Sequence, residues 1–156
     1  MEKITLTVGI PAYNEEANIK RLILSVMAQG SSSFILEKII IFADSCTDKT
    51  IEEVTSIKDK RIIVLVNKKR KGKAFGLNTI ALKSDSDILV HLDADILIND
   101  ESTLEKLIEP IIKKSAHLTS ARIKEYSATS KFEQVLRISM LMKKEIFEHL
   151  NKGNNI

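Results

Sequence analysis

Two carboxylates stand one residue apart at the end of an apolar segment, in the run Asp93-Ala94-Asp95. Like charges this close together are unfavourable unless a positive group binds beside them. Hard divalent cations such as Mg²⁺ or Mn²⁺ take carboxylate oxygens as ligands, and they often bind together with substrate phosphates. The pair therefore predicts a divalent-cation site, and the alternative interpretation is a solvent-facing acidic turn.

Three further polar segments also follow directly after apolar, strand-like segments. They are Pro11-Ala12-Tyr13-Asn14-Glu15-Glu16, Asp44-Ser45-Cys46-Thr47-Asp48 and Asn67-Lys68-Lys69-Arg70-Lys71-Gly72-Lys73. Taken singly, each has an ordinary interpretation: a helix start, a turn with a helix cap, and a solvated basic loop. The glycine-rich phosphate loops are excluded, because Gly72-Lys73 lacks the other residues of a P-loop and no G-x-G-x-x-G occurs. A phosphate would instead be held by a metal ion and a lysine.

The chain alternates strand-like and helix-like segments that would bring these four segments to one edge of a sheet. Apolar, β-branched runs predict strands at residues 5–10, 38–43, 62–66, 87–92 and 118–123. Helical spacing predicts helices at residues 14–29, 47–57, 73–83, 101–108 and 132–150, with Asn14 as the first N-cap and a disturbance at Pro110. Buried strands joined by helices are typical of α/β proteins with a mainly parallel sheet and helices on both faces. Ligands of such sheets bind beyond the carboxyl ends of the strands, where all four polar segments lie.

The composition is that of one ordinary globular domain. Of 156 residues, 44% are hydrophobic and 29% are charged, which argues against disorder. The net charge of +3 is too small to indicate nucleic-acid binding, and no apolar stretch approaches the ~20 residues that span a bilayer. No basic-then-apolar leader opens the chain, and the single cysteine, Cys46, cannot form an internal disulfide. We therefore expect a cytoplasmic protein that binds no nucleic acid.

In this order, the four polar segments resemble the nucleotide-sugar-binding half of family 2 glycosyltransferases, which have a GT-A (Rossmann-like) fold. The matching strings are VGIPAYNEEANI, IIIFADSCTDKT, NKKRKGKAFGLN and LVHLDADI, and they span roughly residues 4–98. The sequence departs from the family pattern at Ala43, Ser45 and Ile96, where the family often has an acidic residue, a glycine and an acidic residue. Four ordered motifs are far more specific than any one of them.

The resemblance implies a donor site for a nucleotide-diphosphate sugar, with UDP as the expected nucleotide. Its base pocket would be lined by Pro11, Ala12 and Tyr13, with the Tyr13 ring packing on the base. Glu15 would reach the nucleoside, and Asp44 would accept a hydrogen bond from the edge of the base.

At the phosphate end, the resemblance implies that Lys73 lies beside the diphosphate as a point charge. Asp93 would hold the ribose side and, with Asp95, the divalent cation, Mn²⁺ or Mg²⁺. The cation would stabilise the charge that develops on the leaving nucleoside diphosphate. The resemblance also implies inversion at the anomeric carbon.

Inverting transfer needs a general base, which is an aspartate in this family. No aspartate follows Asp100 and the chain has no tryptophan, so no catalytic base can be named. We expect residues 1–125 to form the nucleotide-sugar-binding core and residues 126–156 to begin a truncated or reduced acceptor region. The alternatives are a non-catalytic nucleotide-binding fragment or module, and a nucleotidyltransferase on a related fold.

The C-terminal part of the chain is basic, with 9 basic and 4 acidic residues at positions 113–156. The helix expected at residues 132–150 has an apolar stripe flanked by lysines. Our first interpretation is that it packs against the sheet. The second is that it lies on an anionic membrane surface, at the inner face of the membrane, where it would suit a lipid-linked acceptor. The sequence leaves open whether the acceptor is a glycan or lipid-linked.

Overall fold

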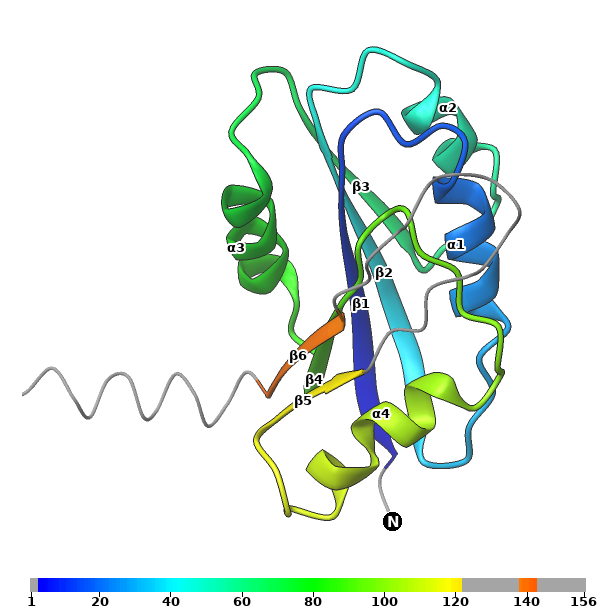
Figure 1. Cartoon of the computed structure of the whole chain (residues 1–156), viewed down its shortest axis with the longest axis vertical. Helices are drawn as coiled ribbons and strands as arrows, with labels where there is room; N and C mark the ends of the chain where they lie inside the picture. Colours follow the sequence, from blue (N-terminus) through cyan, green and yellow to red (C-terminus); the bar gives the residue numbers. More distant parts are fainter. Residues whose placement is uncertain (1–2, 122–137, 143–156) are drawn as a thin grey trace, which may run out of the picture.

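The computed structural model describes residues 3–121 and 138–142, which form an α/β structure around one sheet (Figure 1). The strands are β1 (Ile4–Ala12), β2 (Phe34–Asp44), β3 (Ile62–Asn67), β4 (Ile88–His91), β5 (Leu118–Ala121) and β6 (Ile138–Met142). The helices are α1 (Ile19–Met27), α2 (Thr50–Thr55), α3 (Lys73–Lys83) and α4 (Thr103–Ile112). The strand order is β3-β2-β1-β4-β6-β5. Strands β1 to β4 are parallel and β6 is antiparallel to both β4 and β5, which confirms the mainly parallel sheet.

Helices cover both faces of the sheet, with α3 on one side and α1 and α2 on the other (Figure 1). The larger core joins Val8 of β1 to Ile23 of α1 and Ile108 of α4, all fully buried. The smaller core places Phe42 of β2 with Ile80 of α3. Because the central strands are covered on both faces, they read as continuous apolar runs rather than as an alternating pattern.

Helix α3 packs very closely on the sheet, because glycines lie at two points of contact. A Cβ atom on Gly9 would lie 2.4 Å from Ile80 Cγ2. A Cβ atom on Gly76 would lie 2.8 Å from Phe42 Cδ1 and 3.3 Å from Pro11 Cβ. Neither position accepts a larger residue without displacing its neighbours. The first turn of α3 is therefore held against the ends of β1 and β2, where the polar segments lie.

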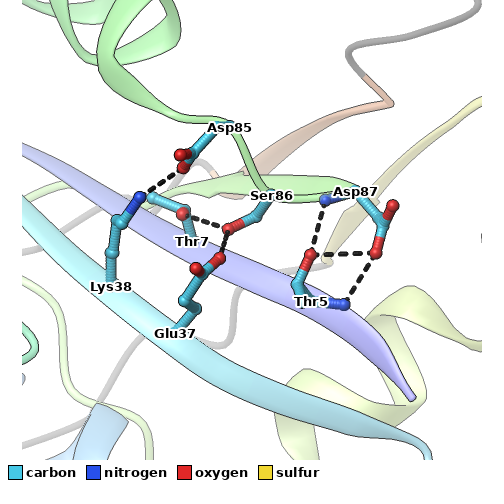
Figure 2. Close-up of polar contacts among 7 residues, drawn as sticks. All are labelled: Thr5, Thr7, Glu37, Lys38, Asp85, Ser86 and Asp87. Carbon is cyan, nitrogen blue, oxygen red and sulfur yellow. Dashed lines mark hydrogen bonds and ion pairs between the residues drawn. The ribbon is translucent and has the colours of Figure 1, made fainter. Parts of the chain in front are cut away.

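A polar network at the opposite end of the strands fixes the connection between α3 and β4 (Figure 2). Its members are Thr5, Thr7, Glu37, Lys38, Asp85, Ser86 and Asp87. The buried hydroxyls of Thr7 and Ser86 lie 2.7 Å apart, and Ser86 Oγ also donates to Glu37 Oε2 at 2.7 Å. Lys38 pairs with Asp85. Since β4 has only four residues, these contacts help to set its register beside β1, and so the position of the acidic pair that follows it.

Strand β3 forms one edge of the sheet. Its Ile63 and Val66 side chains are exposed. Basic residues flank it at both ends, including Arg61 just before the strand and Lys68 just after it.

The first and fourth predicted helices have different bounds in the structure. The first helix begins at Ile19 rather than Asn14, whose backbone has a left-handed φ of 54° and is not a helix cap. Helix α4 continues two residues past Pro110, which the sequence analysis expects to disturb it after Ile108. Proline removes one backbone donor, and the buried face of α4, ending with Ile111, keeps the last turn packed.

The continuous helix expected at residues 132–150 is wrong at positions 138–142, which form β6. This strand pairs with β4, and Ile88 stands opposite Met142 in the register. Without β6, the backbone donors and acceptors along that side of β4 would have no strand partner, and this pairing outweighs the local helical spacing. The remainder of that predicted helix and its membrane contact lie outside the described residues, and the division at residue 125 stays a prediction. No helix within the described ranges combines the length and apolar character needed to cross a bilayer.

Candidate functional site

A cavity of about 320 Å³ opens where β1, β2 and β4 end. Its lining comes from all four polar segments and consists of Pro11, Ala12, Tyr13, Glu15, Phe42, Asp44, Arg70, Gly72, Lys73, Asp93, Ala94 and Asp95. The eight residues that the sequence analysis assigns to the donor site are all among them. The structure thus brings these residues together around one space, while the role of each stays a prediction.

The loops after β1 and β2 hold each other in place. Asn14 Oδ1 accepts a hydrogen bond from the Thr47 backbone N–H at 2.8 Å, and Glu15 donates its backbone N–H to Thr50 Oγ1 at 2.7 Å. Asn14 therefore serves the contact between the loops rather than the start of α1. These bonds fix the loop that carries Tyr13 and Glu15 relative to the end of β2.

The buried Asp44 carboxylate organises the loop between β3 and α3. Oδ1 accepts from Asn67 Nδ2 at 3.0 Å and from the Lys71 N–H at 3.0 Å, and Oδ2 accepts from the Gly72 N–H at 2.7 Å. Burial opposes ionisation of Asp44, but the bonds from Asn67, Gly72 and Lys71, with the nearby charge of Arg70, outweigh it and lower the pKa. Asp44 is therefore ionised at neutral pH. The sequence predicts that Asp44 contacts the base, but it does not predict these contacts with the loop.

Among the residues that line the cavity, a cation lies on an aromatic ring. The Arg70 guanidinium carbon is 3.6 Å from the centroid of the Tyr13 ring, a cation–π contact. Tyr13 is 39% exposed, so its ring is accessible from the cavity. Tyr13 and Arg70 together provide a flat, positively charged surface of the kind on which nucleobases stack.

Lys73 forms an ion pair with Asp93, and both residues line the cavity. The Asp93 side chain is 22% exposed, and Asp95 also lines the space. The ammonium group on Asp93 shows that a positive charge can reach this carboxylate, and two carboxylates are a suitable donor set for a hard cation.

Within residues 3–121 and 138–142, no group of three or more His, Cys, Asp or Glu side chains is arranged to hold a metal. Asp93 and Asp95 could still hold a cation that completes its coordination with phosphate oxygens, as Mg²⁺ commonly does. The residues present therefore fit a cation that binds with a phosphate-bearing ligand better than one that binds alone.

The buried His91 contributes no charge to the site at neutral pH. It ends β4 and lies beside Gly9. Burial, and then the charge of Lys73, lower its pKa to about 4. The charge around the cavity therefore comes from the carboxylates and from the basic residues of the β3–α3 loop.

Sequence reasoning does not identify four of the lining residues: Phe42, Arg70, Gly72 and Ala94. Arg70 belongs to a basic run whose usual interpretation is a solvated loop, and only its position after the third strand marks it. Gly72 has a φ of 87°, which glycine adopts without strain, and its N–H is one of the donors to Asp44.

Known proteins resemble this chain in sequence and in fold. The model of the Glycosyl transferase family 2 matches residues 7–156. An uncharacterized glycosyltransferase of Haemophilus influenzae is 28% identical over 116 residues, covering 73% of this chain and 45% of that protein. The 4,4'-diaponeurosporenoate glycosyltransferase of Staphylococcus haemolyticus is 30% identical over 108 residues, covering 67% of this chain and 28% of that protein. The chain thus spans less than half of the length of either relative.

Solved structures show the same fold. The mannosyltransferase PcManGT of Pyrobaculum calidifontis, in complex with GDP-Man and Mn²⁺, has a TM-score of 0.74 at 22% identity, covering 96% of this chain and 47% of that one. S. aureus TarS in complex with UDP has a TM-score of 0.68 at 19% identity, covering 83% and 38%. Glucosyl-3-phosphoglycerate synthase of Mycobacterium tuberculosis, with Mn²⁺, UDP and phosphoglyceric acid, has a TM-score of 0.62 at 23% identity, covering 74% and 42%. Because the family model covers nearly the whole sequence, this chain belongs to glycosyltransferase family 2.

Proposed function

We propose that this chain binds a UDP-sugar together with a divalent cation and supplies the donor site of an inverting glycosyltransferase. The observation that carries the proposal is that one cavity is lined by an aromatic ring in contact with a guanidinium group, by two carboxylates and by a lysine. Three of the structural relatives support it, since one holds GDP-Man with Mn²⁺, one holds UDP and one holds UDP with Mn²⁺.

Different residues bind the base, the diphosphate and the cation. Tyr13 and Arg70 receive the base, and Asp44 holds the loop that carries Arg70 while accepting from the edge of the base. Lys73 neutralises the diphosphate. Asp93 and Asp95 would hold the cation, which when bound supplies Lewis-acid stabilisation of the leaving diphosphate.

Calorimetric titration of the chain with UDP tests the proposal. We expect UDP to bind more tightly in Mn²⁺ than in EDTA, because the diphosphate and the two carboxylates would share the cation. UMP, which lacks the second phosphate, should show a much smaller effect of Mn²⁺. Tighter binding of GDP than of UDP would contradict the assignment of the base, and UDP titrations that overlay with and without Mn²⁺ would contradict the cation site.

A second candidate function is a nucleotide-binding module without turnover. No residue of this sequence is assigned as the catalytic base, and the proposal assigns only residues that bind the donor. Both functions predict the same binding of UDP. Release of UDP from a UDP-sugar on addition of an acceptor would distinguish them, and it would favour the enzyme.

Replacing Tyr13 with alanine should weaken UDP binding by about 1 kcal/mol, or roughly fivefold. The expected loss is at the lower end of the range for stacking on an aromatic ring, because Tyr13 is partly exposed and Arg70 still flanks the base. Calorimetry in Mn²⁺ measures the change, and Tyr13→Phe, which keeps the ring, is the matched control. Equal affinities for the alanine variant and the native chain would remove Tyr13 from the base pocket.

A further inference from the structure

The ion pair between Lys73 and Asp93 involves a carboxylate that is also assigned to the divalent cation. Lys73 is the first residue of α3, and its side chain meets Asp93, which follows β4. Both line the same cavity. The same Asp93 carboxylate is proposed to hold the cation, so the ammonium group and the cation require the same negative charge.

The backbone of Lys73 is held in place, while its side chain is largely exposed. Gly72, just before it, is bound by Asp44, and Gly76 lies against Phe42 and Pro11. The Lys73 side chain itself is 56% exposed. A long, exposed side chain on a fixed backbone can exchange one anionic partner for another without a change in the fold.

We propose that Lys73 is an internal competitor of the divalent cation, and that a nucleoside diphosphate relieves the competition. Without nucleotide, Lys73 neutralises Asp93 and weakens cation binding. The diphosphate attracts the ammonium group, and Asp93 is then released to the cation. Lys73 thus acts as a positioning residue that makes cation binding depend on the nucleotide. This inference rests on the proposed function, because it needs both ligands to use this cavity.

The size of the effect follows from the fraction of time for which Asp93 is free. An exposed ion pair contributes little free energy, so Lys73 occupies Asp93 for only part of the time. The apparent affinity for the cation is reduced in proportion to the fraction of protein in which Asp93 is free to bind it. We therefore expect the loss of Lys73 to strengthen Mn²⁺ binding in the absence of nucleotide by about two- to fivefold. The factor by which UDP strengthens Mn²⁺ binding should fall by a similar amount, because no lysine is left to release.

The test is a titration of the protein with Mn²⁺, in which the electron paramagnetic resonance signal of free Mn²⁺ reports binding, without UDP and then with it. Lys73→Met removes the charge and keeps an apolar stem, and Lys73→Arg keeps the charge. Lys69→Met is the matched control, because it removes one charge from the loop just before α3 at a residue that does not line the cavity. Thermal unfolding verifies that each variant is folded.

We expect Lys73→Met alone to bind Mn²⁺ more tightly without nucleotide, with Lys73→Arg and Lys69→Met like the native chain. The inference is overturned if Lys73→Met binds Mn²⁺ no better than the native chain, if Lys69→Met gains as much, or if no variant binds Mn²⁺ at all. The proposed function fails separately if UDP does not bind in the presence of Mn²⁺, since the comparison with Mn²⁺ alone needs no nucleotide.

Discussion

Replacing Asp95 with asparagine should abolish most of the gain in UDP affinity that Mn²⁺ produces. The amide has nearly the shape of the carboxylate but no charge, and a hard cation prefers charged oxygen ligands. Only Asp93 would then remain of the acidic pair. Coupling between two ligands is typically about 5- to 150-fold, and we expect the ratio of UDP affinities in Mn²⁺ and EDTA to fall below about twofold in this variant. Calorimetry under the two conditions measures that ratio.

Asp100→Asn is the matched control for this experiment. Asp100 lies five residues further along the chain, where it contacts Ser102 and Lys106 rather than the cavity. Its replacement should leave the effect of Mn²⁺ unchanged. An Asp95→Asn variant that kept the full effect, or an Asp100→Asn variant that lost it, would show that the cation does not depend on the acidic pair. The fold should persist in both, because neither side chain belongs to the apolar core.

Replacing Asp44 with asparagine should lower both stability and nucleotide affinity. The amide has one acceptor oxygen where the carboxylate has two, so a part-buried donor such as the Gly72 N–H would lose its partner, at a cost of about 1–3 kcal/mol in the free energy of unfolding. The loop that carries Arg70 would also lose its anchor. We expect UDP to bind at least about tenfold more weakly, which corresponds to about 1.4 kcal/mol. Denaturant unfolding and calorimetry measure the two effects.

The stability difference between this variant and the native chain should depend on pH. The pKa of Asp44 is lower in the folded chain than its ordinary value of 3.8, so ionised Asp44 stabilises the fold above that value. The contribution is lost as the pH falls through the folded pKa, and the two unfolding free energies should converge there. For the nucleotide affinity alone, Asp59→Asn is the control, because Asp59 pairs with Arg61 outside the cavity and its replacement should not alter UDP binding. A difference that stayed constant down to pH 2 would exclude a stabilising charge on Asp44.

The parallel strands and the place of the site can be predicted from the sequence because both depend on local patterns. The apolar run at 38–43 lies within β2, and the predicted helix at 73–83 has the bounds of α3. Once the strands are parallel, their carboxyl ends meet at one edge, so the residues just after them must lie together. The shared cavity around Tyr13, Asp44 and Asp93 follows from that rule.

The remaining features depend on partners that are distant in the sequence. Asn14 is a typical helix cap by its local pattern, but its partner in the structure is Thr47, from the next loop. Residues 138–142 have helical spacing, but they pair with β4, about fifty positions earlier. Arg70 is one of several basic residues in a loop, and only the fold shows that it lies on Tyr13. Local sequence propensity predicts secondary structure poorly where such tertiary contacts compete with it.

The basic residues at the two ends of β3 have a consequence for self-association. An edge strand with exposed apolar side chains is a template on which a second copy of the chain could add its own edge, and charged residues oppose such pairing. Asp59 offsets the charge of Arg61, but Lys60 stands just before it. Two β3 edges placed side by side would set Lys60 near Lys60 if parallel and near Lys68 if antiparallel. Either arrangement brings positive charge to positive charge. The flanking residues thus help to keep the sheet from growing through this edge, and salt would weaken that protection by screening them.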